Sequence, residues 1–109
     1  MTEEELQRAK DFLSSYTLHK KWLNASRYER EYFGGGADDE VFLQAKLFRV
    51  REFIAALPNC PEKLFLHCHY VRGHSVEKCA ELMDVSARSA YRLKKRALLL
   101  AAQKLSSQE

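Results

Sequence analysis

The basic residues near the end of the chain have the types and spacing that nucleic-acid recognition requires. No acidic residue lies between Ser86 and Gln108. Arginine can donate paired hydrogen bonds to a guanine edge, and both arginine and lysine neutralise phosphates. This pattern predicts a helix over 86–104 that enters the DNA major groove. The residues expected to contact DNA are Ser86, Arg88, Ser89, Tyr91, Arg92, Lys94, Lys95 and Arg96.

Position along this helix predicts a division of labour. Arg88 and Arg92 lie nearest the helix start and, at about 100° per residue, on one outward stripe, so we expect them to contact bases. Ser89 and Tyr91 can add contacts to bases or phosphates. The cations at 94–96 come later and are expected mostly to hold the DNA backbone.

The residues before this helix predict how it is positioned. A short helix from about Ser75 to Met83, a tight turn and a second helix capped by Ser86 are typical of a helix-turn-helix. The small Ala80 allows a close crossing of the two helices. Asp84 occupies a turn position where left-handed backbone is usual, and Val85 is expected to tuck between the helices.

The opposite stripe of the last helix is apolar and should face the core: Ala90, Leu93, Ala97, Leu100 and Ala101. From Ala97 to Ala102 the sequence is apolar on every side. An exposed helix of this kind would be unstable in water, so either the N-terminal helices or another subunit must cover it.

The remainder of the chain divides into helices, and no segment predicts a strand. Thr2 and Glu5 form a capping-box pattern that opens a helix, expected to break near Thr17 and to end at Gly34–Gly36. A second helix follows, capped by Asp38 or Asp39, and a third spans 62–72 after Pro61. We therefore predict an all-α fold: an N-terminal helical arm with a glycine hinge over 1–36, and a helix-turn-helix domain over 37–109.

Charge is unevenly distributed. Residues 1–55 hold nine basic and ten acidic residues, a net charge of −1, whereas residues 56–109 hold nine and five, a net charge of +4. A basic helix face is often only solvated surface, but charge confined to one helix favours DNA binding by that helix. No apolar run is long enough for a membrane span, and the acidic N-terminus is unlike a secretory signal, so we expect a cytoplasmic protein without membrane contact.

Three cysteines and several histidines raise a zinc hypothesis. Cys68 lies between His67 and His69, and Cys79 follows nearby. The spacing favours buried thiols, because Cys68 aligns with Leu64 and Val71 on a helix and no Cys-x-x-Cys pair is present. No catalytic constellation or phosphate loop is found, so we expect no enzyme activity, no cofactor and no metal.

Residues 53–98 resemble region 4 of bacterial sigma factors, and resemble still more the small phage and prophage late-gene regulators of the ArpU and RinA type. The matching stretches are 54–58 (IAALP), 70–73 (YVRG), 75–80 (SVEKCA) and 86–92 (SARSAYR). The chain departs from that pattern at Cys79, Asp84 and Ala90, where Ile, Gly and Val are usual. The resemblance implies a regulator of phage late genes that contacts promoter DNA.

Two functions from different classes follow from these observations. The favoured one is a sequence-specific transcriptional regulator whose partners are double-stranded DNA and, as a further candidate, RNA polymerase. The alternative is a phage DNA-packaging component resembling a small terminase subunit. Self-association into a homodimer, through the N-terminal arm or the C-terminal helix, is compatible with either function.

Overall fold

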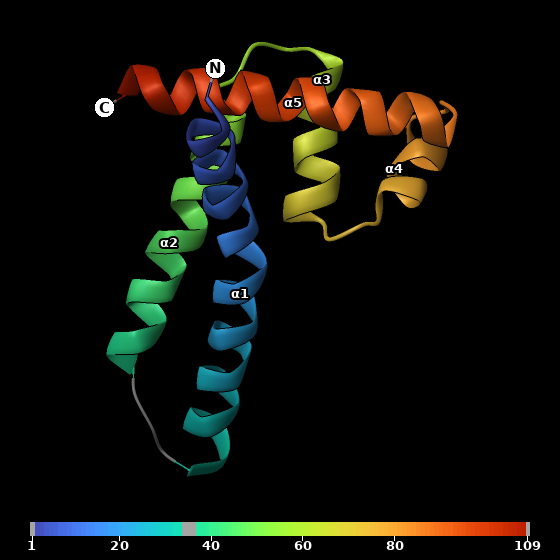
Figure 1. Cartoon of the computed structure of the whole chain (residues 1–109). Helices are drawn as coiled ribbons and strands as arrows, with labels where there is room; N and C mark the ends of the chain where they lie inside the picture. Colours follow the sequence, from blue (N-terminus) through green and yellow to red (C-terminus); the bar gives the residue numbers. More distant parts are fainter. Residues whose placement is uncertain (1, 34–36, 109) are drawn as a thin grey trace.

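The computed structural model describes residues 2–33 and 37–108, and these residues form helices joined by short turns, with no strand among them (Figure 1). The predicted all-α class is therefore confirmed. The predicted glycine hinge at 34–36 and the predicted caps at Asp38 and Asp39 lie outside the residues and side chains that are described.

The first helix, α1 (Glu3–Phe33), is continuous. The Thr2 hydroxyl accepts a hydrogen bond from the Glu5 backbone N–H at 3.2 Å, which confirms the predicted N-terminal cap. The predicted break near Thr17 is wrong. Thr17 is exposed, and a β-branched residue on an exposed face costs only a few tenths of a kcal/mol of helix propensity. Buried residues at helical spacing on both sides, Leu13 and Leu23, hold the helix together across it.

The second helix, α2 (Ala37–Ala55), runs back along α1 to make a helical hairpin (Figure 1). Near the α5 end, the rings of Phe12 and Phe53 meet edge to face at 5.1 Å. Towards the other end, Arg30 Nη1 lies 2.9 Å from Glu40 Oε2. Apolar packing at one end and an ion pair at the other fix the register of the two helices.

A short helix, α3 (Pro61–Leu66), follows with Pro61 in its first turn, as predicted, and continues into a π-helical turn, η1 (His67–Val71). The Arg72 N–H donates to the His67 carbonyl oxygen at 3.0 Å, five residues back. One prediction here is wrong: Cys68 is buried, but Leu64 is 55% exposed and does not share its face. Leu64 lies in α3, before the π-helical turn, and the buried face of α3 passes through the adjacent Phe65 and Leu66 instead.

The last two helices are α4 (Val76–Leu82) and α5 (Ala87–Gln108). Figure 1 shows α5 extending across the molecule, with the α1–α2 hairpin below its C-terminal part and α3 and α4 near its N-terminal part. The apolar stretch of α5 is covered by α1 of the same chain. Leu98 is buried, it lines a small hollow together with Leu6, and the Ser106 hydroxyl donates to Glu5 Oε2 at 3.5 Å. The prediction that the N-terminal helices cover this stretch is confirmed.

One hydrophobic core joins the α1–α2 hairpin to the helices α3, α4 and α5. Leu13 of α1, Ile54 of α2, Phe65 of α3 and Ala97 of α5 belong to a single cluster of buried residues. Among the helices of the described part, none has the length and apolar composition that a membrane span requires.

Candidate nucleic-acid interface

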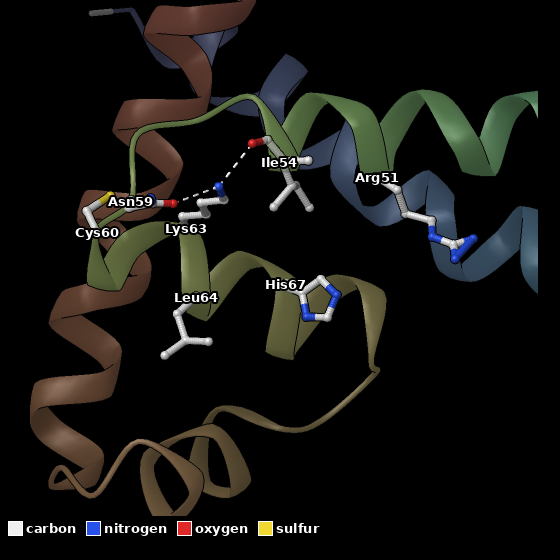
Figure 2. A pocket seen from close by; sticks show the side chains of 8 residues that line it. Arg51, Ile54, Asn59, Cys60, Lys63, Leu64 and His67 are labelled. Atoms are coloured by element: carbon white, nitrogen blue, oxygen red, sulfur yellow. Dashed lines mark hydrogen bonds between the residues drawn. The ribbon is translucent and has the colours of Figure 1, made fainter.

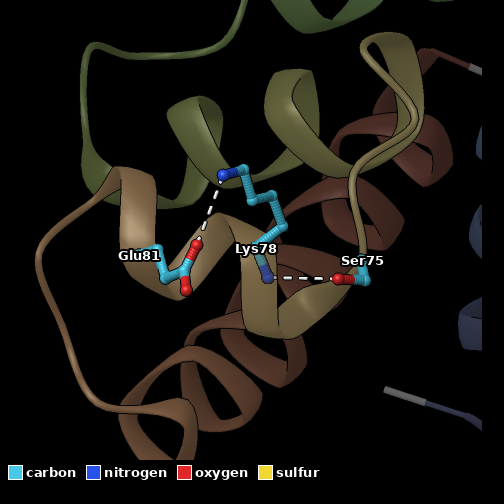
Figure 3. Close-up of polar contacts among 3 residues, drawn as sticks. All are labelled: Ser75, Lys78 and Glu81. Atoms are coloured by element: carbon cyan, nitrogen blue, oxygen red, sulfur yellow. Dashed lines mark hydrogen bonds and ion pairs between the residues drawn. The ribbon is translucent and has the colours of Figure 1, made fainter.

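The start of α4 is set by local hydrogen bonds. The Ser75 hydroxyl accepts from the Lys78 N–H at 3.1 Å, and Lys78 Nζ lies 3.3 Å from Glu81 Oε2 one turn further on (Figure 3). Serine at this position satisfies one of the free amides of the first turn. The first helix of the predicted pair therefore exists, and its N-terminus is fixed by the sequence around Ser75.

The turn after α4 has the hydrogen bonds of a Schellman motif. Asp84 has φ 57°, its N–H donates to the Glu81 carbonyl at 3.2 Å, and the Val85 N–H donates to the Ala80 carbonyl at 2.9 Å. Left-handed backbone at Asp84 is confirmed. Ala80 is only 4% exposed, as expected for a small residue where two helices cross closely.

One prediction for this turn is wrong. The Val85 side chain is 40% exposed and does not fill the space between the helices. The partly buried Met83 packs against the core instead. The backbone hydrogen bonds from Asp84 and Val85 already close the turn, so its geometry does not require burial of the Val85 side chain.

The start of α5 is capped by Ser86, as predicted. Its hydroxyl oxygen accepts from the Ser89 N–H at 3.1 Å and lies 3.0 Å from the Ser89 hydroxyl. The helix begins one residue after the predicted start and continues to Gln108, four residues beyond the predicted end. Because the cap and the turn are both rigidly bonded, the direction of the first turn of α5 is determined by α4.

Three of the predicted contact residues form an exposed cationic surface on the first half of α5: Arg88, Arg92 and Lys95. Their spacing of four and three residues places them on one helix face. None of them has a hydrogen bond or an ion pair with any of the residues that the structure describes. Ser89, Arg92 and Lys95 also line a shallow hollow of about 430 Å³. We call Arg88, Arg92 and Lys95 the free cation face.

Two other predicted residues, Tyr91 and Arg96, are engaged by other helices. The Tyr91 hydroxyl donates to Glu77 Oε1 at 2.7 Å, and this hydrogen bond holds the pKa of Glu77 below its usual value and raises the pKa of Tyr91. Arg96 Nε lies 3.6 Å from Glu62 Oε1 of α3. Neither acidic partner follows from the sequence pattern, because each lies on a different helix from the side chain that it contacts.

Lys94 lies on the flank of α5 that faces His69 and is half-buried. Burial lowers the pKa of His69, its hydrogen bond with the His74 carbonyl partly opposes that effect, and the charge of Lys94 lowers it further. Lys94 is therefore turned away from the free cation face by about 100° or more, as its position between Arg92 and Lys95 would predict.

The cysteines of this region are core residues. Cys68 and Cys79 are buried, and burial, with Cys68 alongside, raises the pKa of the Cys79 thiol to about 12. A thiol with so high a pKa is protonated at neutral pH, as expected for a buried core residue. Within residues 2–33 and 37–108, no group of three or more histidine, cysteine or acidic residues is arranged to hold a metal ion.

Comparison of the chain with protein-family models, with curated proteins and with solved structures gives no match. The resemblance to phage regulators therefore stays a prediction from the sequence. What the structure adds is local geometry: a bonded turn, a capped helix and a free cation face.

Proposed function

We propose that the chain is a sequence-specific DNA-binding protein in which α4, the turn at 83–86 and α5 act as a helix-turn-helix. The observation that carries this proposal is the free cation face of Arg88, Arg92 and Lys95. These three project on one face from a rigid helix start and have no partner in the described part of the chain, so their charge is available to a ligand.

The geometry suits recognition in the major groove. That groove admits one α-helix, and the first turns of the recognition helix reach the base edges. Arg88 and Arg92 lie in those turns, so they are the proposed base-reading residues. Lys95 lies one turn later, where a side chain meets phosphates more readily than bases.

The engaged residues have supporting roles in this proposal. Ser86 and Ser89 fix the helix start and present hydroxyls to the backbone of the DNA. Tyr91 is held by Glu77, which links α5 to α4. Lys94 and Arg96 add positive potential beside the groove, with Arg96 partly neutralised by Glu62.

The biological role follows from the sequence resemblance. We propose a transcriptional regulator of phage or prophage origin that acts in the cytoplasm on promoter DNA, with RNA polymerase as a further candidate partner. Regulators of this size commonly bind as dimers to two half-sites, and self-association through α1 or α5 would provide that arrangement.

The test is a DNA-binding titration over a series of salt concentrations, after selecting bound sequences from a random duplex pool. If about three cations meet phosphates, the slope of log K against log salt should be roughly −3 per protomer. Replacing Arg88 and Arg92 by Gln should abolish preference for the selected site. Replacing Lys21 and Arg49, which are exposed on the hairpin, removes the same charge and should leave that preference unchanged.

Two results would contradict the proposal. One is the absence of binding at low salt, and the other is an equal loss of affinity in the two double variants. The same samples give the mass in solution by sedimentation. A ring of many subunits would favour the DNA-packaging alternative, and a monomer or dimer favours the regulator.

A further inference from the structure

A second surface, away from the free cation face, combines apolar and cationic side chains. Two hollows lie along α2, one of about 520 Å³ between α2 and α3 and one of about 650 Å³ between α1 and α2. Arg51 lines both of them, so they form one continuous surface, which we call the α2 groove. Figure 2 shows its α3 end, where Leu64 and His67 lie across from Arg51.

The cationic residues of the α2 groove come from three helices. Lys20 and Arg27 of α1, Arg51 of α2 and Lys63 of α3 all line it, and none of the lining side chains that the structure describes is acidic. Arg51 has no hydrogen bond or ion pair with any other residue in the described ranges. Lys63 is tied to the end of α2 through the Ala55 carbonyl at 3.0 Å and to Asn59 Oδ1 at 3.1 Å, which fixes its ammonium at the rim (Figure 2).

The apolar residues of the α2 groove are large and exposed. Val41 is 67% and Phe48 60% exposed on α2, and Leu64 is 55% exposed on α3. Val41 and Phe48 are seven residues apart, which places them two turns apart on one face of α2. Side chains of this size exposed in a row on a small protein are typical of a surface that binds a partner.

We propose that the α2 groove binds an acidic amphipathic helix of a partner protein. Its apolar stripe would lie on Val41, Phe48 and Leu64, and its carboxylates would meet the surrounding cations. The stretch from Val41 to Ala55 is about 21 Å long at 1.5 Å per residue, which a helix of about 14 residues matches. This binding activity is separate from DNA binding, because none of its residues belongs to the free cation face.

The chemistry of the α2 groove favours this occupant over two others. A nucleic acid would use the cations but would leave the exposed Val41 and Leu64 without a partner. A second copy of this chain would need an acidic helix free to dock. The chain has two runs of three acidic residues, at 3–5 and 38–40. In the first, Glu5 accepts a hydrogen bond from Ser106 of α5, and in the second, Glu40 is buried and paired with Arg30.

The experiment selects binders from a library of random peptides, about 16 residues long, displayed on phage, against the full chain. We expect enriched peptides to be acidic and to carry apolar residues at i, i+3 or i+4, and i+7. Labelled synthetic copies are then titrated by fluorescence anisotropy. Phe48→Ala and Arg51→Glu should each weaken binding about tenfold or more.

Two matched variants control for exposure and charge. Phe42 is 59% exposed on the same helix, and Arg49 is exposed there too, but neither lines the α2 groove. Phe42→Ala and Arg49→Glu should leave affinity within about twofold, which is the range of energetically neutral contacts. Circular dichroism melting checks that all four variants fold.

Several outcomes would overturn the proposal. These are no enrichment, enriched peptides that are basic or lack the helical spacing, and equal weakening by Phe42→Ala and Phe48→Ala. A DNA or RNA oligonucleotide that displaces the peptide, with displacement lost in Arg51→Glu, would assign the surface to nucleic acid. Dimerisation of the chain alone that is lost in Phe48→Ala would assign it to a second copy.

Discussion

Residues 87–96 of α5 expose all of their cations except the half-buried Lys94, whereas residues 97–102 bury alanine and leucine side chains beneath α1 and the rest of the core. Both segments are regular α-helix and are equally poor in acidic residues. The difference lies in what surrounds them: a bonded turn and a short helix precede the first, and the hairpin covers the second. The first half is therefore anchored by one buried stripe, at Ala90 and Leu93, and exposes its other side, whereas the second half is buried over a wider face.

The largest expected effect comes from placing the same substitution in each half. Ala101 is fully buried and Ala87 is exposed. Ala101→Glu introduces an unpaired charge into the core and should lower the free energy of unfolding by at least about 3 kcal/mol, a large part of the stability of a small domain. Ala87→Glu should change it by less than about 1 kcal/mol, since a carboxylate suits the start of a helix.

Urea unfolding followed by circular dichroism measures both changes. Ala87→Glu should also weaken DNA binding, because it places a negative charge beside Arg88. Equal destabilisation by the two substitutions would show that Ala87 and Ala101 do not differ in burial.

The next effect separates two cations within the first half. Arg88→Ala should cost about 1–3 kcal/mol of binding free energy on the selected DNA site and relax the sequence preference. Lys95→Ala should weaken selected and random DNA to the same degree, because a phosphate contact carries no sequence information. Competition titrations with both duplexes measure the two effects. If both variants lose the same affinity for selected and for random DNA, the proposed assignment of Arg88 to bases and Lys95 to phosphates is wrong.

A smaller effect concerns the backbone that leads into α4 and α5. Gly73 has φ 76°, and a Cβ added there would meet no heavy atom within 4 Å, so the cost of Gly73→Ala comes from the backbone alone. We expect about 1 kcal/mol of destabilisation. Asp84, with φ 57°, offers the reverse test: Asp84→Gly should stabilise by up to about 1 kcal/mol. Thermal melting of both variants measures these changes. If both melting temperatures shifted in the same direction, left-handed backbone would not be the cause of the two effects.

The smallest effect is on one carboxyl group beside the free cation face. Tyr91→Phe removes the hydrogen bond that holds the pKa of Glu77 down, so the pKa of Glu77 should rise toward its usual value. A pH titration followed by NMR at the Glu77 carboxyl measures it. Tyr28→Phe, at a comparably exposed tyrosine on α1, should leave the Glu77 titration unchanged. An unchanged titration in Tyr91→Phe would mean that α4 and α5 are not linked through this pair.

The sequence predicted the features that depend on neighbouring residues. The caps at Thr2 and Ser86, the left-handed turn at Asp84 and the buried stripe through Ala97 each follow from a few residues of local pattern. These features depend on backbone hydrogen bonds and helical spacing between residues that are close in sequence, so one short segment is enough to predict them.

The features that the sequence did not predict depend on contacts between segments. Glu77 reaches Tyr91 and Glu62 reaches Arg96 because of how α3, α4 and α5 are rotated about their axes, and no spacing rule within one helix encodes that rotation. The exposure of Leu64 also depends on contacts between segments. In a run of apolar residues at 64–66, packing against the other helices decides which side chains are buried, and here these are Phe65 and Leu66.

Because α5 is continuous from Ala87 to Gln108, inserting residues within it changes how its two halves are oriented relative to each other. Their angular phase is fixed by the helical repeat, because no break lies between them. Inserting one residue after Arg96 would rotate the cations, together with the buried Ala90 and Leu93, by about 100° relative to the buried residues at 97–102, while leaving each half intact as a helix. Inserting seven residues would restore the phase to within about 20° and move the cations farther from the hairpin. Length can therefore change in this helix only in steps of about two turns if both surfaces are to keep their orientation.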